Sequence, residues 1–238
     1  MSNIETLRQM LGTAAQIEKK AQEPFILSPQ AEKYIETVKS IASYKKPSYE
    51  AAENVFWKFY EQKIRETGKI VVVDDSLRII LQNSIKWLLD EGEYNPNMGL
   101  FFVGAKGRSK TQIMKALLRT AFYFQMPKQF KFNEAPFIFD ECQYNKEFKI
   151  SEFYGETRCF DDIGFSEPQI LSFGQTMRPI ESIMNKRYTR FINEGQLTHM
   201  TTNLSLNQLR EHFDDRIIDR FSEMFNIVFF EGTSFRKK

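Results

Sequence analysis

The sequence contains few of the residues that build zinc-stabilised or disulfide-rich domains. Its 238 residues include 2 cysteines and 2 histidines. Cys142 and Cys159 lie far apart, and neither has a second cysteine or a histidine beside it. A structural zinc site needs four such ligands at short spacings, and a disulfide framework needs several cysteine pairs. Both are therefore disfavoured, and we expect two reduced, unreactive thiols.

Long apolar runs are also missing. No stretch approaches the roughly 20 residues that a helix needs to span a bilayer. The first residues, MSNIETLRQML, are polar and lack the apolar segment of a signal peptide. We therefore expect a cytoplasmic protein that makes no contact with a membrane.

An excess of charge of one sign is absent as well. The chain has 33 basic and 31 acidic residues, a formal net charge of +2. This balance excludes a bulk attraction to nucleic acid, so any such binding has to come from a local patch. What the chain does have is 42% hydrophobic residues, including 23 phenylalanines, enough for an aromatic-rich core.

The chain divides into two regions by pattern. Residues 1–70 are predicted to be all helical, because apolar residues recur at helical spacing and Ser48 and Gly68 give start and stop signals. Residues 69–77 are either an extended linker or a short strand, and Asp75 or Ser76 is expected to cap the helix that follows. Residues 71–238 then alternate between strand and helix.

The alternating region predicts an α/β fold with a parallel sheet flanked by helices. The expected strands lie at 98–104, near Phe137–Phe139, at 156–165, at 196–206 and at 225–232. A helix that starts at Pro179 and one or two helices after Leu206 are expected between them.

One loop between a strand and a helix resembles a phosphate-binding loop. The segment GAKGRSKT, residues 104–111, fits the pattern G-x-x-x-x-G-K-[ST] except that serine replaces the second glycine. In such a loop the backbone N–H groups surround the phosphates, the lysine adds a positive charge and the threonine hydroxyl binds Mg²⁺. The predicted nucleotide-binding residues are Gly104, Ala105, Lys106, Gly107, Arg108, Ser109, Lys110, Thr111 and Gln112.

Ser109 is the one departure from that pattern. The glycine it replaces often adopts a left-handed backbone conformation, which costs a residue with a Cβ roughly 1–2 kcal/mol. We therefore expect nucleotide binding to be weakened and not abolished. The alternative is that the segment is only a turn between a core strand and a helix.

Polar residues at the ends of two later strands can complete a nucleotide site. Asp161 and Asp162 follow the third strand, where one carboxylate can hold Mg²⁺ through water and the other can polarise an attacking water. The predicted metal ligands are Thr111 and Asp161. Asn203 ends the next strand and can orient that water. Taken alone, each of these residues can equally form a cap or a turn.

Three arginines are candidates for sensing the γ-phosphate. Arg216 and Arg220 are four residues apart on one helical face, where they can reach a neighbouring subunit's nucleotide or form surface ion pairs with Asp215 or Asp219. Arg236, near the end of the chain, can reach the phosphate from a C-terminal element or belong to a basic tail.

Taken in order, four segments resemble the DnaC-like branch of the AAA+ ATPases, which contains replicative-helicase loaders and IstB-type transposition ATPases. The segments are GLFFVGAKGRSKT, CFDDIGFSEP, KRYTRFINEGQLTHMTTNLS and DDRIIDRFSEMFNIVFFEGTSFR. The resemblance implies an AAA+ P-loop domain with a five-stranded parallel sheet over residues 71–238. It covers nothing in residues 1–70, for which a partner-binding role is expected.

The resemblance also implies a role for each candidate residue. Lys110 and Thr111 match the Walker A lysine and threonine, and Asp161 and Asp162 match the Walker B pair. Asn203 matches sensor 1. Arg220 matches the arginine finger, with Arg216 as the alternative, and Arg236 matches sensor 2. Two departures are Ser109 and Arg158, which stands inside the Walker B strand.

The family implies ATP and Mg²⁺ as cofactors, slow ATP hydrolysis, and a replicative helicase and DNA, more often single-stranded, as partners. ATP then acts as a switch that favours self-association into an open spiral. Candidate DNA contacts are Lys128 and Lys131, or Arg187 and Arg190 beside Tyr188. Two alternatives stay open: a transposition helper of the IstB kind that binds duplex DNA, and a scaffold whose nucleotide site has decayed.

Overall fold

The computed structural model describes residues 44–231 apart from residues 67, 69, 71, 145–148, 165–169, 173 and 174. The chain divides into two compact units, Met1–Tyr44 and Lys45–Lys238. All the secondary structure described here belongs to the second unit. The helices expected before residue 44 lie outside the described residues.

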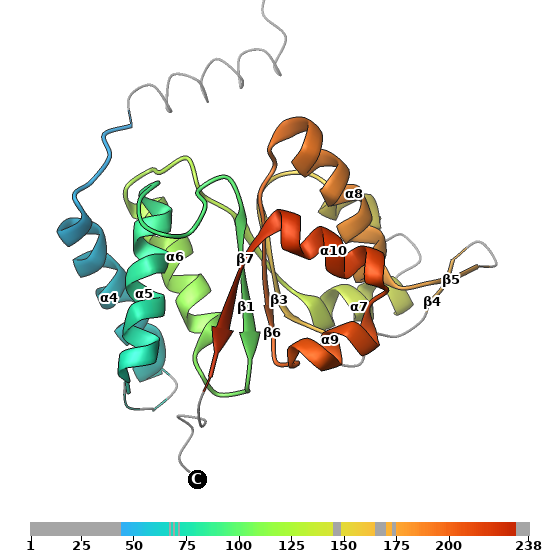
Figure 1. Ribbon diagram of the computed structural model, residues 1–238, viewed down its shortest axis with the longest axis horizontal. Coiled ribbons are helices and arrows are strands. Elements are labelled where there is room, and N and C mark those ends of the chain that lie inside the picture. Colours follow the sequence, from blue (N-terminus) through green and yellow to red (C-terminus); the bar gives the residue numbers. More distant parts are fainter. Residues whose placement is uncertain are drawn as a thin grey trace, which may run out of the picture. The chain divides into compact units, whose positions relative to one another are not determined.

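A five-stranded parallel sheet forms the centre of this unit (Figure 1). Its strands, in spatial order, are β2 (Lys131–Glu134), β3 (Arg158–Ile163), β6 (Thr198–Thr202), β1 (Gly99–Gly104) and β7 (Phe225–Phe230). All four pairings are parallel. The predicted α/β class and the parallel five-stranded sheet are therefore confirmed. Two short antiparallel strands, β4 (Ile170–Ser172) and β5 (Gln175–Met177), form a separate pair.

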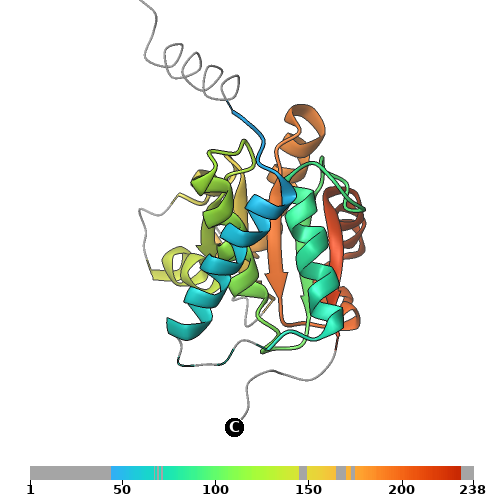
Figure 2. The same ribbon diagram turned by 90° about the vertical axis from the view of Figure 1, so that its left-hand side faces the viewer.

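Helices cover both faces of the sheet. Figure 1 shows α4 (Tyr49–Glu66), α5 (Asp75–Leu88) and α6 (Lys110–Tyr123) on one side, and Figure 2 looks directly onto this layer. The other side carries α7 (Ala135–Tyr144), α8 (Pro179–Glu194), α9 (Leu206–His212) and α10 (Asp215–Met224). A single 3₁₀ turn, η1, spans Ile150–Phe153. Among the described residues, no helix is long and apolar enough to cross a bilayer.

Helix α4 packs onto the sheet unit, although it lies within the N-terminal region defined from the sequence. Ser48 caps its start, where the Ala51 N–H donates to the serine hydroxyl at 3.2 Å. Its buried residues recur every four positions: Ala52, Phe56, Tyr60 and Ile64. The Phe59 ring meets the Tyr123 ring of α6 edge-on, with centroids 6.3 Å apart. This part of residues 1–70 therefore lies against the helix that follows the phosphate-binding loop.

Two of the expected local structures were wrong. The strand expected near Phe137–Phe139 is the middle of α7, and the edge strand lies earlier, at Lys131–Glu134. Ile138 and Phe139 are buried while Phe137 is 58% exposed, which is a helical pattern within an apolar triplet too short to distinguish the two. The cap of α5 is Asp74, whose carboxylate accepts from the Leu77 N–H at 2.8 Å.

Arg158, the second departure from the family pattern, is accommodated in β3. It is the first residue of the strand, and its guanidinium donates to the carbonyls of Gly155 and Glu152 at 3.1 and 2.8 Å and to the Asn133 side chain at 3.1 Å. Because these acceptors satisfy the guanidinium, a buried arginine is tolerated at the amino end of the strand.

Candidate functional site

The loop between β1 and α6 begins at a glycine that no other residue can replace. Gly104 has a φ of +131°, and a Cβ there would lie 2.5 Å from the Phe230 carbonyl oxygen. The next turn contains Gly107, whose φ is +90°. These two glycines let the chain curl tightly from the end of β1 into the first turn of α6. The predicted phosphate-binding loop therefore has the strand, loop and helix order that its chemistry requires.

Ser109 occupies the left-handed conformation expected of the missing glycine. Its φ and ψ are 63° and 16°, and its side chain makes no capping hydrogen bond to α6. The backbone of the loop is thus the one a glycine would adopt, held here by a residue with a Cβ. The cost is about 1–2 kcal/mol, so something nearby has to offset it.

Lys110 is folded back over the loop. Its ammonium donates to the carbonyl oxygens of Gly104 and Ala105 at 2.7 and 2.8 Å, and to the Asn203 side-chain oxygen at 2.9 Å. The residue is only 5% exposed. The lysine therefore holds its charge at the mouth of the loop and connects it directly to the end of β6.

A second link joins the loop to β3. The Thr111 hydroxyl lies 2.9 and 3.0 Å from the two carboxylate oxygens of Asp161, and the Thr201 hydroxyl donates to the same carboxylate at 2.6 Å. Asp161 is 5% exposed. Burial raises its pKa, and the hydrogen bonds from Thr201 and Thr111 and the charge of Lys115 counteract that rise. The two predicted metal ligands are therefore in direct contact.

These oxygens suit Mg²⁺. A threonine hydroxyl beside a buried carboxylate offers the hard oxygen donors that this ion prefers. Among the described residues no group of three or more acidic, histidine or cysteine side chains gathers as a metal cluster. Sites that bind Mg²⁺ together with phosphates typically use only one or two protein carboxylates, and the donor set here is of that kind.

Asp162 and Asn203 form the third side of the site. Asp162 lies at an irregularity in the pairing of β3 with β6 and has a φ of +59°. Its N–H donates to the Thr201 hydroxyl at 2.9 Å, and the Asn203 amide donates to its carboxylate. Positive φ values in residues other than glycine are uncommon and cluster at functional sites. The bulge turns the Asp162 carboxylate toward the loop, away from the regular alternation of the strand.

A cavity of about 240 Å³ lies over these groups. Its polar wall includes the loop from Lys106 to Gln112 together with Asp162, Thr201 and Asn203. Its apolar lining consists of Ile64, Ile70 and Val72. Sequence reasoning missed these three residues, because Ile64 was interpreted as part of the apolar face of a helix and the run KIVVV, which contains Ile70 and Val72, as a strand or linker. The only available signal was that such an apolar run stands next to the start of α5.

An ion pair between a buried arginine and a half-exposed aspartate anchors the loop to the start of α5. Arg108 is 1% exposed, and its guanidinium donates to the two Asp74 oxygens at 2.7 and 3.2 Å. This contact lowers the pKa of Asp74, mainly through the hydrogen bond from Arg108. Asp74 thus caps α5 and binds the loop at the same time. The sequence pattern placed Arg108 toward the nucleotide but gave no indication of Asp74.

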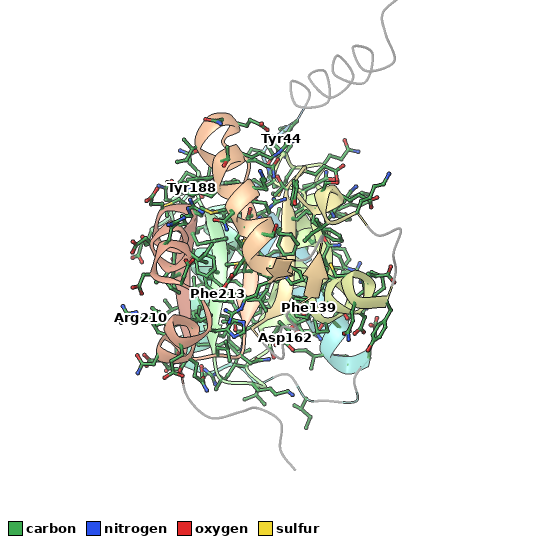
Figure 3. The ribbon with its side chains drawn as sticks, turned by 90° about the vertical axis from the view of Figure 1, so that its right-hand side faces the viewer. Tyr44, Phe139, Asp162, Tyr188, Arg210 and Phe213 are labelled. Atoms are coloured by element: carbon green, nitrogen blue, oxygen red, sulfur yellow. The ribbon has the colours of Figure 1, made fainter. Side chains whose placement is uncertain are left out.

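The predicted arginine positions differ in their surroundings. Arg220 donates to the Asn185 side chain, and its guanidinium lies 4.7 Å from the centre of the Tyr188 ring. Figure 3 places Tyr188 toward the opposite end of the molecule from Asp162. Arg216, one turn closer to the start of α10, is exposed. Arg236 lies outside the described residues.

The candidate DNA contacts are corrected in part. Arg187 is fully buried and donates to the carbonyls of Phe153, Glu156 and Leu197 at 2.8, 2.8 and 2.9 Å. Desolvation of this kind is incompatible with a surface contact to phosphate. Lys128 is likewise engaged, donating to the Trp87 carbonyl and pairing with Asp90, both at 2.6 Å.

The remaining two candidates are open to solvent. The Lys131 and Arg190 side chains are 60% and 42% exposed. Each forms a surface ion pair, Lys131 with Glu156 at 2.6 Å and Arg190 with Glu194 at 3.1 Å.

The geometry of the site is that of a P-loop domain with polar residues at the carboxyl ends of adjacent strands. Comparison with known proteins agrees with this class. No family model matches the chain, and no curated protein matches it. Solved structures do. The crystal structure of DnaI has a TM-score of 0.54 at 16% identity and covers 71% of this chain and 89% of its own.

The crystal structure of the DnaC helicase loader has a TM-score of 0.53 at 18% identity and covers 74% of this chain and 98% of its own. At these identities the likeness concerns the fold. The chain therefore shares the fold of DnaI and of the DnaC helicase loader, as the resemblance in the sequence implied.

Proposed function

We propose that the protein is an AAA+ ATPase of the helicase-loader type, in which ATP with Mg²⁺ binds between the phosphate loop and the end of β3. The observation that supports this best is the direct contact of Thr111 with Asp161 beside Lys110. These are the three side chains that a P-loop site needs in one place. A scaffold would have no use for a strained loop, a buried carboxylate and a buried ammonium assembled together.

In this proposal the backbone N–H groups of residues 105–110 and the Lys110 ammonium bind the phosphates. Thr111 and Asp161 hold Mg²⁺, which neutralises charge on the phosphate oxygens. The apolar wall of Ile64, Ile70 and Val72 receives the base. A cavity lined by both an apolar surface and a charged loop fits a nucleotide, because the base needs apolar surroundings and the triphosphate needs polar, positively charged ones.

Hydrolysis then falls to the residues at the strand ends. Asp162 accepts a hydrogen bond from the attacking water and polarises it, and Asn203 orients that water toward the γ-phosphate. An arginine of a neighbouring copy stabilises the charge on the transferred group. Arg216 fits this role better than Arg220, because Arg216 is exposed at the start of α10 whereas Arg220 is held against α8.

Partner binding completes the proposal. The solved neighbours include a protein named as a helicase loader, which favours a replicative helicase over a transposase as partner. Single-stranded DNA is proposed as the second partner from the resemblance in the sequence. ATP acts as an assembly switch for self-association into an open spiral. Residues 1–70 are proposed to contact the helicase, with α4 connecting that contact to the ATPase core.

Calorimetry with ATP and Mg²⁺ tests the nucleotide site. Lys110→Ala is expected to weaken binding at least about tenfold, since a hydrogen bond from a charged group contributes about 1.5–3 kcal/mol. Lys131→Ala, which removes an exposed lysine of β2, is the matched control and should bind as the unmodified protein does. Equal, negligible heats for the unmodified protein and Lys110→Ala, with both folded, would contradict the proposal.

Affinity capture tests the partner. The tagged protein is incubated with purified replicative helicase and, separately, with a purified transposase, each with and without ATP, and Lys110→Ala serves as the control. Retention that needs ATP and is lost in Lys110→Ala is expected. Retention of a transposase in place of the helicase would favour the IstB-type function.

A further inference from the structure

The left-handed Ser109 of the loop lies near a buried tyrosine of α4, and the role inferred below for this tyrosine rests on the proposed nucleotide binding. Tyr60 of α4 is fully buried. Its ring stacks on Phe56 with centroids 5.7 Å apart and meets Trp57 edge-on at 5.6 Å. The ring is therefore fixed in position by its own helix, so its hydroxyl has one direction in which to point.

The Tyr60 hydroxyl is a buried polar group that is not satisfied. In the part of the chain that the structure describes, it makes no hydrogen bond of normal geometry. The groups that act on it are the Ser109 side chain and the Arg108 guanidinium: burial raises the pKa of Tyr60, and these two groups counteract the rise. An unpaired buried hydroxyl costs about 1–3 kcal/mol and therefore calls for an explanation.

The neighbouring residues place the Tyr60 hydroxyl close to the proposed nucleotide site, on the side of α4. Ile64, one helical turn after Tyr60 on the same buried face of α4, lines the cavity together with Ser109. Arg108, the residue before Ser109, is itself fixed by Asp74. Arg108 therefore holds the loop to the start of α5. Ser109, the next residue of the loop, faces α4 without a completed hydrogen bond to Tyr60.

We propose that Tyr60 is a positioning residue for the phosphate-binding loop and acts through Ser109: the two hydroxyls form a full hydrogen bond when the loop closes around the phosphates. The bond compensates for the left-handed conformation of Ser109 in the nucleotide-bound state. Helix α4, which lies outside the segments that carry the family resemblance, thereby becomes part of the nucleotide site.

A double-mutant cycle tests this. The unmodified protein, Tyr60→Phe, Ser109→Gly and the double variant are compared for ATP–Mg²⁺ affinity by calorimetry and for thermal unfolding without nucleotide. Tyr60→Phe is expected to weaken affinity about threefold to tenfold, the range for one hydrogen bond. In the Ser109→Gly background the same change is expected to have an effect of less than about twofold, because the partner is gone.

Stability gives the second readout. Because the hydroxyl is unsatisfied without nucleotide, Tyr60→Phe should leave the unfolding temperature of the free protein unchanged or raise it. A merely structural tyrosine would behave in the opposite way, with a lower unfolding temperature and an unchanged affinity. Tyr94→Phe is the control. Tyr94 is a half-buried tyrosine whose pKa burial raises to about 12, and its replacement should alter neither affinity nor the cycle.

The outcomes separate the two proposals. If the unmodified protein binds ATP and Tyr60→Phe weakens affinity equally in both backgrounds, or not at all, the Tyr60–Ser109 contact is refuted while nucleotide binding stands. If neither the unmodified protein nor Ser109→Gly binds ATP although both are folded, the proposed function itself fails.

Discussion

The Lys110 ammonium donates to the Asn203 side-chain oxygen at 2.9 Å, and the amide of the same asparagine donates to the Asp162 carboxylate. One side chain at the end of β6 thus connects the loop that would bind phosphate to the carboxylate that would polarise water. Because both contacts involve groups with a proposed role in hydrolysis, Asn203 is the residue through which phosphate binding can be sensed.

Asn203→Ala separates binding from chemistry. The variant keeps Lys110, Thr111 and Asp161, so we expect ATP affinity within about threefold of the unmodified protein. Its hydrolysis rate is expected to fall at least about tenfold, because loss of a polar group that acts in the transition state typically costs more than that. Calorimetry and phosphate release measure the two quantities.

Asn83→Ala is the matched control for Asn203→Ala. Its amide donates to Glu93 in an exposed contact at 3.3 Å, and neither quantity should change. An Asn203→Ala variant that is folded and hydrolyses ATP at the normal rate would remove Asn203 from the site.

Arg216→Ala is expected to lower ATP hydrolysis at least about tenfold, since an arginine supplied by a neighbour is often worth far more. Its unfolding temperature should not change, because the side chain is exposed. Mixing Arg216→Ala with Lys110→Ala should restore part of the activity, because each copy supplies what the other lacks at a shared site. Two inactive variants that stay inactive when mixed would argue against a shared site.

Arg220→Ala should instead lower the stability of the protein and leave ATP hydrolysis unchanged. It loses its hydrogen bond to Asn185 and its contact with the Tyr188 ring, which together stabilise the α8–α10 contact by about 1 kcal/mol. Thermal and urea unfolding measure this loss. Normal stability with impaired hydrolysis would instead assign the finger to Arg220.

Arg187→Met is expected to lower the free energy of unfolding by about 3–5 kcal/mol, because several buried acceptors lose their donor. Arg190→Met is its control on the same helix. The Arg190 side chain is 42% exposed and pairs with Glu194 at 3.1 Å, so a loss below about 1 kcal/mol is expected. Urea unfolding measures both. Similar losses for the two variants would contradict the structural role of Arg187.

The lowered pKa of the buried His199 predicts that the stability of the protein depends on pH. Burial lowers its pKa to about 3, assisted by the charges of Arg187 and Lys128, whereas in the unfolded chain it titrates near pH 6.5. Between these values the unfolded state binds more protons, so the contribution is complete above about pH 6.5 and is lost as the pH falls toward 3. The neutral ring accepts from the Leu100 N–H at 3.1 Å through Nδ1.

Urea unfolding at pH 7, 6 and 5 tests this. The difference in unfolding free energy between the unmodified protein and His199→Gln should shift by up to about 1.4 kcal/mol per pH unit below pH 6.5. A difference that stays constant with pH would show that His199 keeps its ordinary pKa in the folded protein.

How much the sequence could predict depends on whether the information is local. The loop, its lysine and the strand before it are consecutive, so their pattern indicated the strand–loop–helix unit directly. Asp161 and Asn203 end neighbouring parallel strands, and such ends meet at one edge of a sheet. The structure indeed brings both residues to the loop.

The contacts of the loop with α4 and α5 could not be predicted in this way. Asp74 meets Arg108 across 34 residues, and Ile64 reaches the cavity from a helix that carries no motif. Such pairs depend on how helices pack over the sheet, and the periodicity of an apolar face does not reveal which helix it meets. The same reason explains Arg187, whose sequence context is that of a surface helix but whose side chain is buried beneath η1 and β6.

The position of α4 bears on where this protein can be shortened. A chain that starts after residue 70 would retain every recognisable motif, yet α6 would lose the helix α4 that packs on it and the cavity would lose Ile64 and Ile70 from its apolar lining. The smallest piece expected to fold with the whole cavity begins near Lys45, so a domain boundary drawn from motifs alone would cut through the folded unit.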